Sequence, residues 1–248
     1  ATTSCGNVAV GMCSLHNHTT GGDNNAIGMC SQFTTSTGAG NNSMGHKSME
    51  LNTTGTINVA IGEQALRRNT TGCCNVALGY IALCANTTGA SNVAVGRGAL
   101  EKNTTSDNNV AIGLNSLQQN TTAANNTAVG GGAMYLNTTG HSNVALGVNA
   151  LDSNTTAACN VAIGMEALAA ATTGHSNVAV GRVTAKSITT GDLNTAVGIC
   201  AGCNITTGNG NVVYGKLAGV NLSNITSEDD RLVLGHQSIT NAYVKVDW

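Results

Sequence analysis

The cysteines are the first residues of this sequence whose types and spacing suggest chemistry. The 248 residues include nine cysteines, an odd number, so at least one thiol stays free or bonds to another chain. Cys200 and Cys203 have the CxxC spacing of metal sites. A structural zinc site also needs a second CxxC or a suitably spaced histidine pair, which the sequence lacks. We therefore expect no metal at this motif.

Histidines and carboxylates form no catalytic set in this sequence. His141 and His175 occupy the same position of a repeat described below, but two repeats apart, which is about 9.6 Å in a stack of strands. That separation is too large for one metal ion. The spacing supports no Ser–His–Asp arrangement, and no glycine-rich turn precedes a helix that could hold a phosphate. We expect no enzyme activity, no cofactor and no metal.

An Asn-Thr-Thr tripeptide recurs along the chain and allows two interpretations. Its asparagines can form a stacked amide ladder, in which each side chain bonds to those above and below. Each asparagine is also an Asn-x-Thr acceptor for N-glycosylation. An inward ladder would be inaccessible to a glycan, so the two interpretations exclude each other at any one site, and the sequence leaves both open. The asparagines are Asn52, Asn69, Asn86, Asn103, Asn120, Asn137 and Asn154.

The asparagines of the Asn-Thr-Thr motif belong to a repeat of seventeen residues. The repeat runs without insertion or deletion from Asn7 to Gly210. This span holds twelve units, and a thirteenth unit begins at Asn211. We number the positions of a unit 1 to 17 from the asparagine that opens it, so residues 75–91 (NVALGYIALCANTTGAS) are the fifth unit. A fixed period of this length indicates a repeat architecture.

The residue types within a unit favour β-structure. Position 5 is glycine in all thirteen units, position 4 is aliphatic in nearly all, and position 3 is alanine in eleven. Positions 2 and 4 share one face of a strand, and positions 1, 3 and 5 share the other, which accepts only small side chains. We expect a strand at positions 2 to 4, a bend at the glycine, and a second short strand around positions 8 to 10. Thr-Thr-Gly at positions 13 to 15 is typical of a turn in which glycine takes a positive φ.

Helical repeats do not fit this unit. Asparagine, threonine and glycine recur at fixed positions and weaken a helix interior, and seventeen residues are too few for a helix pair. Extended, one unit spans roughly 56 Å at about 3.3 Å per residue, which suits one flattened coil. The sequence therefore predicts an all-β fold, a parallel β-solenoid or β-roll of about twelve 17-residue coils with a C-terminal cap.

In a solenoid, residues at the same repeat position of adjacent units stack into a column, so the repeat predicts which side chains are neighbours. Within the twelve complete units, every Asp, Glu, Lys and Arg lies at positions 6, 7, 10, 11, 16 or 17, so these positions are the outward corners. Glu50 and Arg67 both occupy position 10 of adjacent units and should lie together. Cys13 and Cys30 both occupy position 7, and coils about 4.8 Å apart would bring their Cα atoms within disulfide range. These two cysteines are therefore either a disulfide or two free thiols.

Composition agrees with a thin rod rather than a globular enzyme. The chain has no proline, one tryptophan, one phenylalanine, 32 glycines and 9% charged residues. Its net charge of −2 offers no electrostatic footprint for nucleic acid, and no apolar run is long enough to span a membrane. We expect residues 1–6 to end a preceding coil, residues 7–215 to form the solenoid, and residues 216–248 to form a cap or neck with closing strands at 231–235 and 242–246.

The repeat resembles known fibre repeats. Its Asn-Val-Ala-Ile-Gly core with a following alanine resembles the head repeats of trimeric autotransporter adhesins, although the period here is longer. The full unit, NVAIG-x-x-AL-x-x-NTTG, is similar to repeats in tail-fibre proteins of phages and large viruses. The C-terminal RLVLGHQSITNAYVKVDW is similar to the segment that precedes a self-cleaving chaperone of the endosialidase type. The resemblance implies a left-handed parallel β-roll in which three chains share an interface.

On these grounds we expect a structural shaft of an extracellular fibre, a viral tail or surface fibre that serves host attachment at the virion surface. The alternative is a cell-surface adhesin or a secreted, glycosylated filament. The expected partners are copies of the chain, as a homotrimer or filament along the Val/Ile column, and a host-surface receptor or glycan. We expect no binding of nucleic acid and no insertion into a membrane.

Overall fold

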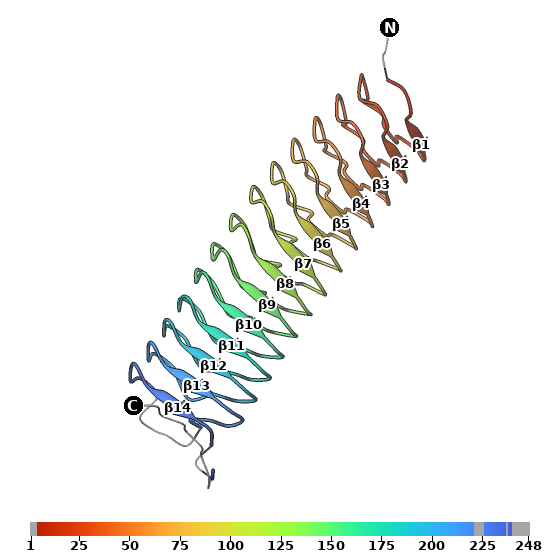
Figure 1. Cartoon of the computed structure of the whole chain (residues 1–248). Coiled ribbons are helices and arrows are strands. Elements are labelled where there is room, and N and C mark those ends of the chain that lie inside the picture. The colour runs from red at the N-terminus through yellow and green to blue at the C-terminus, as the bar shows by residue number, and fades with distance from the viewer. Residues whose placement is uncertain (1–3, 221–225, 237, 240–248) are drawn as a thin grey trace, which may run out of the picture.

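The computed structural model describes residues 4–220, 226–236 and 238–239, which form one long stack of coils (Figure 1). Each coil contributes one three-residue strand, and the strands lie in chain order in a single sheet, with β1 and β14 at opposite ends. The strands are β1 (Val8–Val10), β2 (Asn25–Ile27), β3 (Asn42–Met44), β4 (Val59–Ile61), β5 (Val76–Leu78), β6 (Val93–Val95), β7 (Val110–Ile112), β8 (Thr127–Val129), β9 (Val144–Leu146), β10 (Val161–Ile163), β11 (Val178–Val180), β12 (Thr195–Val197), β13 (Val212–Tyr214) and β14 (Leu232–Leu234).

Neighbouring strands are parallel, and each pairs with the same positions of the next repeat. In β5 and β6, for example, Val76 pairs with Val93 and Leu78 pairs with Val95. The described residues contain no helix, and therefore none that could cross a membrane. The all-β parallel solenoid and the strand at positions 2 to 4 are confirmed.

Small and aliphatic side chains fill the interior. Beyond the first coil, alanine at position 3 and leucine at position 9 are fully buried, as Ala77 and Leu83 show. The position-5 glycine makes the bend after the strand. Gly79 has a φ of 135°, and a Cβ on it would lie 2.7 Å from the carbonyl carbon of Gly96 in the next coil. Glycine is therefore required here by both its conformation and the close approach of the coils.

The second strand expected around positions 8 to 10 does not form, and this expectation was wrong for the described coils. Positions 6 to 11 are turns, and the residues at positions 7 and 9 have left-handed backbone conformations. In the fourth coil, Gln64 has a φ of 58° and Leu66 a φ of 50°. Left-handed residues cannot continue a strand. They instead fold the chain into a tight corner that directs Leu66 into the interior.

The Thr-Thr-Gly turn also differs from the expectation. Gly72, at position 15, has no positive φ; the left-handed residue lies at position 17, where Cys74 has a φ of 60°. The carbonyl oxygen of Gly72 accepts hydrogen bonds from the amides of Asn58 and Asn69. A Cβ on Gly72 would lie 3.0 Å from Nδ2 of Asn86. The glycine therefore provides room for asparagine side chains rather than an unusual φ.

The stack continues beyond Gly215. Strand β14 lies parallel to β13, with Val212 paired to Leu232, twenty residues later instead of seventeen. Of the two closing strands that we expected, the one at 231–235 contains β14 and is a further rung of the sheet. The other, at 242–246, lies outside the described residues.

Candidate functional site

The seven asparagines of the Asn-Thr-Thr motif point into the coils and are completely buried. Nδ2 of Asn69 donates to Oδ1 of Asn52 at 2.8 Å, and Nδ2 of Asn86 donates to Oδ1 of Asn69 at the same distance. The contact repeats in each coil as far as Asn154. This is the arrangement that the ladder interpretation predicts, and the folded coil has no room for a glycan at these amides.

A second asparagine ladder, which the sequence analysis missed, occupies position 1. The backbone N–H of Asn75 and its side-chain Nδ2 both donate to Oδ1 of Asn58, at 3.0 and 3.1 Å. The same backbone contact continues to Asn211, where it is 3.0 Å long. The signal in the sequence is the asparagine at position 1 of all thirteen units.

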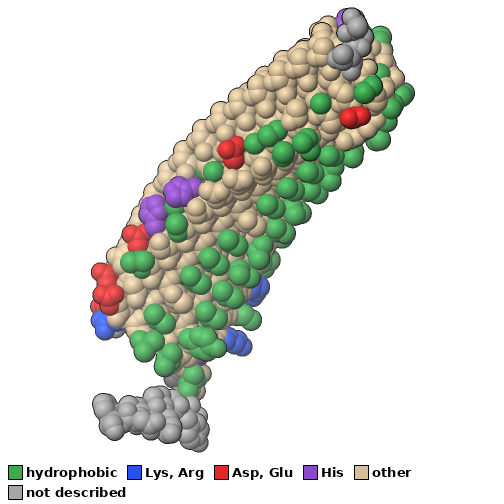
Figure 2. Space-filling view, turned by 45° about the horizontal axis from the view of Figure 1, so that its top comes forward, with side chains coloured by type: hydrophobic (Ala, Val, Ile, Leu, Met, Phe, Trp, Pro, Cys, Tyr) green, Lys and Arg blue, Asp and Glu red, His purple; other side chains and the backbone are tan. Residues whose placement is uncertain are grey.

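An apolar face runs along the outside of the sheet, formed by positions 2 and 4 and bordered by position 6. Figure 2 shows hydrophobic side chains gathered along one side of the rod. Positions 2 and 4 carry no charged residue in any of the thirteen units. The exposed large residues at positions 4 and 6 are Val10, Met12, Ile27, Met29, Met44, Ile61, Tyr80, Ile112, Leu114, Leu146, Val148, Ile163, Met165, Ile199 and Tyr214.

The charged corners include the pair expected from stacking. Arg67 Nε lies 2.6 Å from Glu50 Oε2, which confirms that position 10 forms a column of neighbours. Lys47 Nζ lies 3.7 Å from the other carboxylate oxygen of Glu50. Glu50 therefore has two cationic neighbours and is one of the least exposed charges of the rod.

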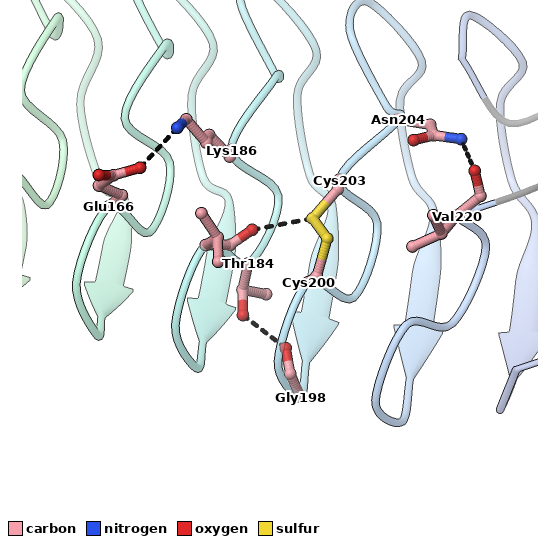
Figure 3. Close-up of a disulfide and its surroundings, with 9 residues drawn as sticks. Glu166, Thr184, Lys186, Gly198, Cys200, Cys203, Asn204 and Val220 are labelled. Carbon is pink, nitrogen blue, oxygen red and sulfur yellow. Dashed lines mark hydrogen bonds and ion pairs between the residues drawn. A yellow bond between two sulfur atoms is a disulfide. The ribbon is translucent and has the colours of Figure 1, made fainter.

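The cysteines pair differently from the expectation. Cys13 and Cys30 are both free thiols, so the disulfide considered between them does not form. Stacked side chains in register project in parallel about 4.8 Å apart, whereas the Cβ atoms of a disulfide lie about 3.8 Å apart. The disulfide instead joins Cys200 to Cys203 within one corner, with Cα atoms 5.2 Å apart (Figure 3). Local corner geometry, rather than stacking, brings these two sulfurs together.

The histidines and carboxylates form no metal cluster in the described part of the chain. No group of three His, Cys, Asp or Glu side chains there could hold a metal ion. Nδ1 of His175 accepts a hydrogen bond from the backbone N–H of Ala158 at 3.0 Å, and His141 contacts the hydroxyl of Ser142. These two histidines make structural contacts at the coil edges.

Two hollows open on the corner made by positions 7, 10 and 11. The first, called here the basic hollow, has a volume of about 310 Å³. Arg67 and Arg68 lie on one side of it. Glu101 and Lys102 lie on the other side, one coil beyond the small residue Ala85. Burial raises the pKa of the neighbouring Cys84 thiol, and the two arginines act in the opposite direction.

The second hollow, called here the acidic hollow, lies five coils further along the same corner. Its volume is about 300 Å³, and Ala169 and Ala170 form its low point. Asp152 lines one side, and Glu166 and Lys186 form an ion pair on the other (Figure 3 shows this pair). Burial raises the pKa of the Asp152 carboxyl. Both hollows therefore arise where a coil carries two small residues at positions 10 and 11.

The fold and these surfaces define the class of this chain as a β-solenoid repeat protein. Comparison with protein-family models, with curated proteins and with solved structures finds no match. The apolar face and the corners are therefore the features from which a function can be inferred.

Proposed function

We propose that the chain is a shaft segment of an extracellular fibre, assembled from three parallel copies that meet along the apolar face. The apolar face is the observation that carries this proposal. Ile61 and Ile112 are 45% and 39% exposed, and equivalent aliphatic side chains recur coil after coil. A continuous apolar surface of this extent on a single chain indicates a protein–protein interface.

The shape supports a mechanical role. Thirteen steps of about 4.8 Å give a rod roughly 62 Å long from β1 to β14. Every unit from Asn7 to Gly210 has seventeen residues, so no loop is enlarged into a binding domain within that span. Such a rod separates its two ends and repeats one surface along its length.

The location and the attachment role rest on the resemblance to tail-fibre and adhesin repeats. A fibre on a virion that contacts its host through the shaft or a distal domain is the function we favour. A cell-surface adhesin or secreted filament would use the same rod. Electron microscopy of native particles separates the two, because fibres attached to a capsid or tail support the first and free or cell-anchored filaments support the second.

Multi-angle light scattering tests the assembly at micromolar concentration, and the expected result is a mass of three chains. A variant with Ile61→Lys and Ile112→Lys places charges on the apolar face and should weaken association at least tenfold, because two buried charges would lack partners. The matched control carries Thr71→Lys and Thr122→Lys, at exposed positions away from this face, and should keep the trimer mass. A monomeric unmodified chain, or a trimer that survives the isoleucine changes, would contradict the proposal.

A further inference from the structure

The basic hollow interrupts a row of long side chains on this corner. Most coils carry at least one long side chain at positions 10 and 11, whereas the fifth coil carries Cys84 and Ala85. Coils on either side place two long charged side chains at the same positions. The hollow of about 310 Å³ is thus one coil wide and is bordered by the side chains of the neighbouring coils.

The charges around this hollow are mainly positive, although the whole chain is slightly negative. Arg67, Arg68 and Lys102 line it together with one carboxylate, Glu101. The acidic hollow has the reverse balance, with two carboxylates and one lysine. The two hollows have nearly the same volume, so charge is the main property that distinguishes them.

The three cationic side chains of the basic hollow differ in the protein partners that they already have. Arg67 pairs with Glu50 outside the hollow, and Lys102 donates to the neutral amide oxygen of Gln119 at 2.6 Å. The Arg68 guanidinium makes no side-chain hydrogen bond or ion pair with the described residues. Glu101 accepts from Nε2 of Gln118 at 2.6 Å. An incoming anion would therefore meet Arg68 without displacing a protein partner, and Lys102 while displacing only a neutral one.

The hollow also has an apolar part. Ile81 and Ala85 line it beside the charged groups. A sugar ring presents an apolar C–H face together with hydroxyls, and a uronic, sialic or sulfated sugar adds an anionic group. Arginine binds carboxylate and sulfate in a bidentate manner. The combination of apolar floor and cationic rim matches that chemistry.

We propose that the basic hollow binds an anionic sugar, with Arg68 and Lys102 holding its carboxylate or sulfate group and Ile81 and Ala85 contacting its ring. In the column of position 11, the positive charge is limited to Arg68 and Lys102. The coil before Arg68 has the uncharged Leu51 at this position, and the coil after Lys102 has the uncharged Gln119. A long polyanion such as nucleic acid requires a continuous row of phosphate contacts, which this corner does not provide. The hollow therefore suits one or two sugar residues.

This site deepens the proposed function, because it places host recognition on the shaft, and its biological meaning rests on the extracellular location. Binding itself is measured on the isolated chain. Its outcome is therefore separate from the light-scattering result, and either proposal can fail alone.

The experiment titrates the full chain with three small probes in isothermal calorimetry: sialyllactose, a heparin-derived disaccharide and neutral lactose. We expect binding of a charged probe and none of lactose, and the probe that binds identifies carboxylate or sulfate as the recognised group. Arg68→Gln should weaken binding about tenfold or more, because a charge-assisted hydrogen bond is lost. Arg182→Gln removes an exposed arginine at position 6 of a distant coil and should leave binding unchanged.

A second variant tests the hollow itself without altering charge. Ala85→Leu fills it, and other coils already carry leucine at position 11, as at Leu51 and Leu136, so the coil can accept this change. We expect Ala85→Leu to abolish binding and Ala170→Leu, which fills the acidic hollow, to leave it intact. Failure of both charged probes to bind, equal binding by Ala85→Leu, or equally tight binding of a short single-stranded oligonucleotide would each overturn the proposal.

Discussion

The fifth coil and the eleventh coil build the same strand over two different interiors. In the fifth coil, Leu83 at position 9 lies in the interior with Asn86 at position 12. In the eleventh coil, the same positions hold Ala185 and Ile188, also fully or almost fully buried. The twelfth coil goes further, with Gly202 and Ile205, and a Cβ on Gly202 would lie 3.0 Å from Cδ1 of Ile205. The large side chain has moved from position 9 to position 12.

Positions 9 and 12 therefore share one interior volume. A leucine at position 9 with a ladder asparagine at position 12 fills it in one region, and a small residue at position 9 with an isoleucine at position 12 fills it in the other. The position-1 ladder, by contrast, runs through both regions unchanged. Where the position-12 ladder ends, the tenth coil carries Ala171, and Oδ1 of Asn154 is buried without a hydrogen-bond partner. The change of interior therefore leaves one unsatisfied polar atom at the boundary.

The largest expected effect on stability comes from giving the fifth coil the residue types that the eleventh coil has at positions 9 and 12. These substitutions test whether the two positions share one volume. Leu83→Ala alone should lower the free energy of unfolding by about 2–5 kcal/mol, because it leaves a cavity. Asn86→Ile alone should also destabilise, through overpacking and a broken ladder. The double variant should be less destabilised than the sum by about 1–3 kcal/mol, since the isoleucine fills the cavity.

Thermal unfolding of the three variants, followed by circular dichroism, measures this coupling. Leu117→Ala with Asn86→Ile is the matched control, because it places the cavity two coils, or about 9.6 Å, away from the new isoleucine. Effects that simply add in the Leu83 pair would show that positions 9 and 12 do not share a volume.

A pair of alanine substitutions separates the middle of the ladder from its end. Asn86→Ala removes the donor to Asn69 and leaves a new unpaired oxygen there. Asn154→Ala likewise removes the donor to Asn137, but it also eliminates the oxygen that is already unpaired. The middle substitution should therefore cost about 1–3 kcal/mol more than the terminal one, the usual penalty for one buried unsatisfied group. Chemical denaturation of both variants gives the difference, and equal losses would show that the ladder does not act as a connected chain.

The smallest expected effect concerns Asp152, in the last coil of the ladder. Burial raises the pKa of this carboxyl in the folded state above its unfolded value. The folded protein therefore binds the proton more readily, and this group reduces stability as pH rises through the unfolded and then the folded pKa. Asp152→Asn has no carboxyl group at this position and does not lose this stability. The melting temperature of the variant minus that of the unmodified chain should therefore rise as the pH is raised from about 3 to neutral. A difference that does not change with pH would mean that burial of Asp152 has no effect on folding.

The sequence predicted the periodic features of the fold because stacking requires equal residues at equal positions. Glycine at position 5 marked the bend, alanine at position 3 marked the strand face that accepts only small side chains, and the Glu50–Arg67 pair followed from the frame alone. Of the candidate site, the sequence indicated the corner positions, and it left the asparagine ladder as one of two interpretations of the Asn-Thr-Thr motif. It did not indicate either hollow, because a hollow also depends on which way the neighbouring side chains point, and only the folded corner shows that.

The sequence by itself determined the period, the strand and the columns, since these depend on residue types repeated every seventeen positions. Only the tertiary structure decided which aliphatic column is interior: Leu83 at position 9 is buried, whereas Ile61 at position 4 faces outward. It also decided that positions 7 and 9 are left-handed, as at Gln64 and Leu66, which replaces the expected second strand by a corner. The physical reason is that residue propensity favours right-handed or extended backbone at such positions. Packing of the stacked coils overrides that preference, and a single repeat unit does not contain this information.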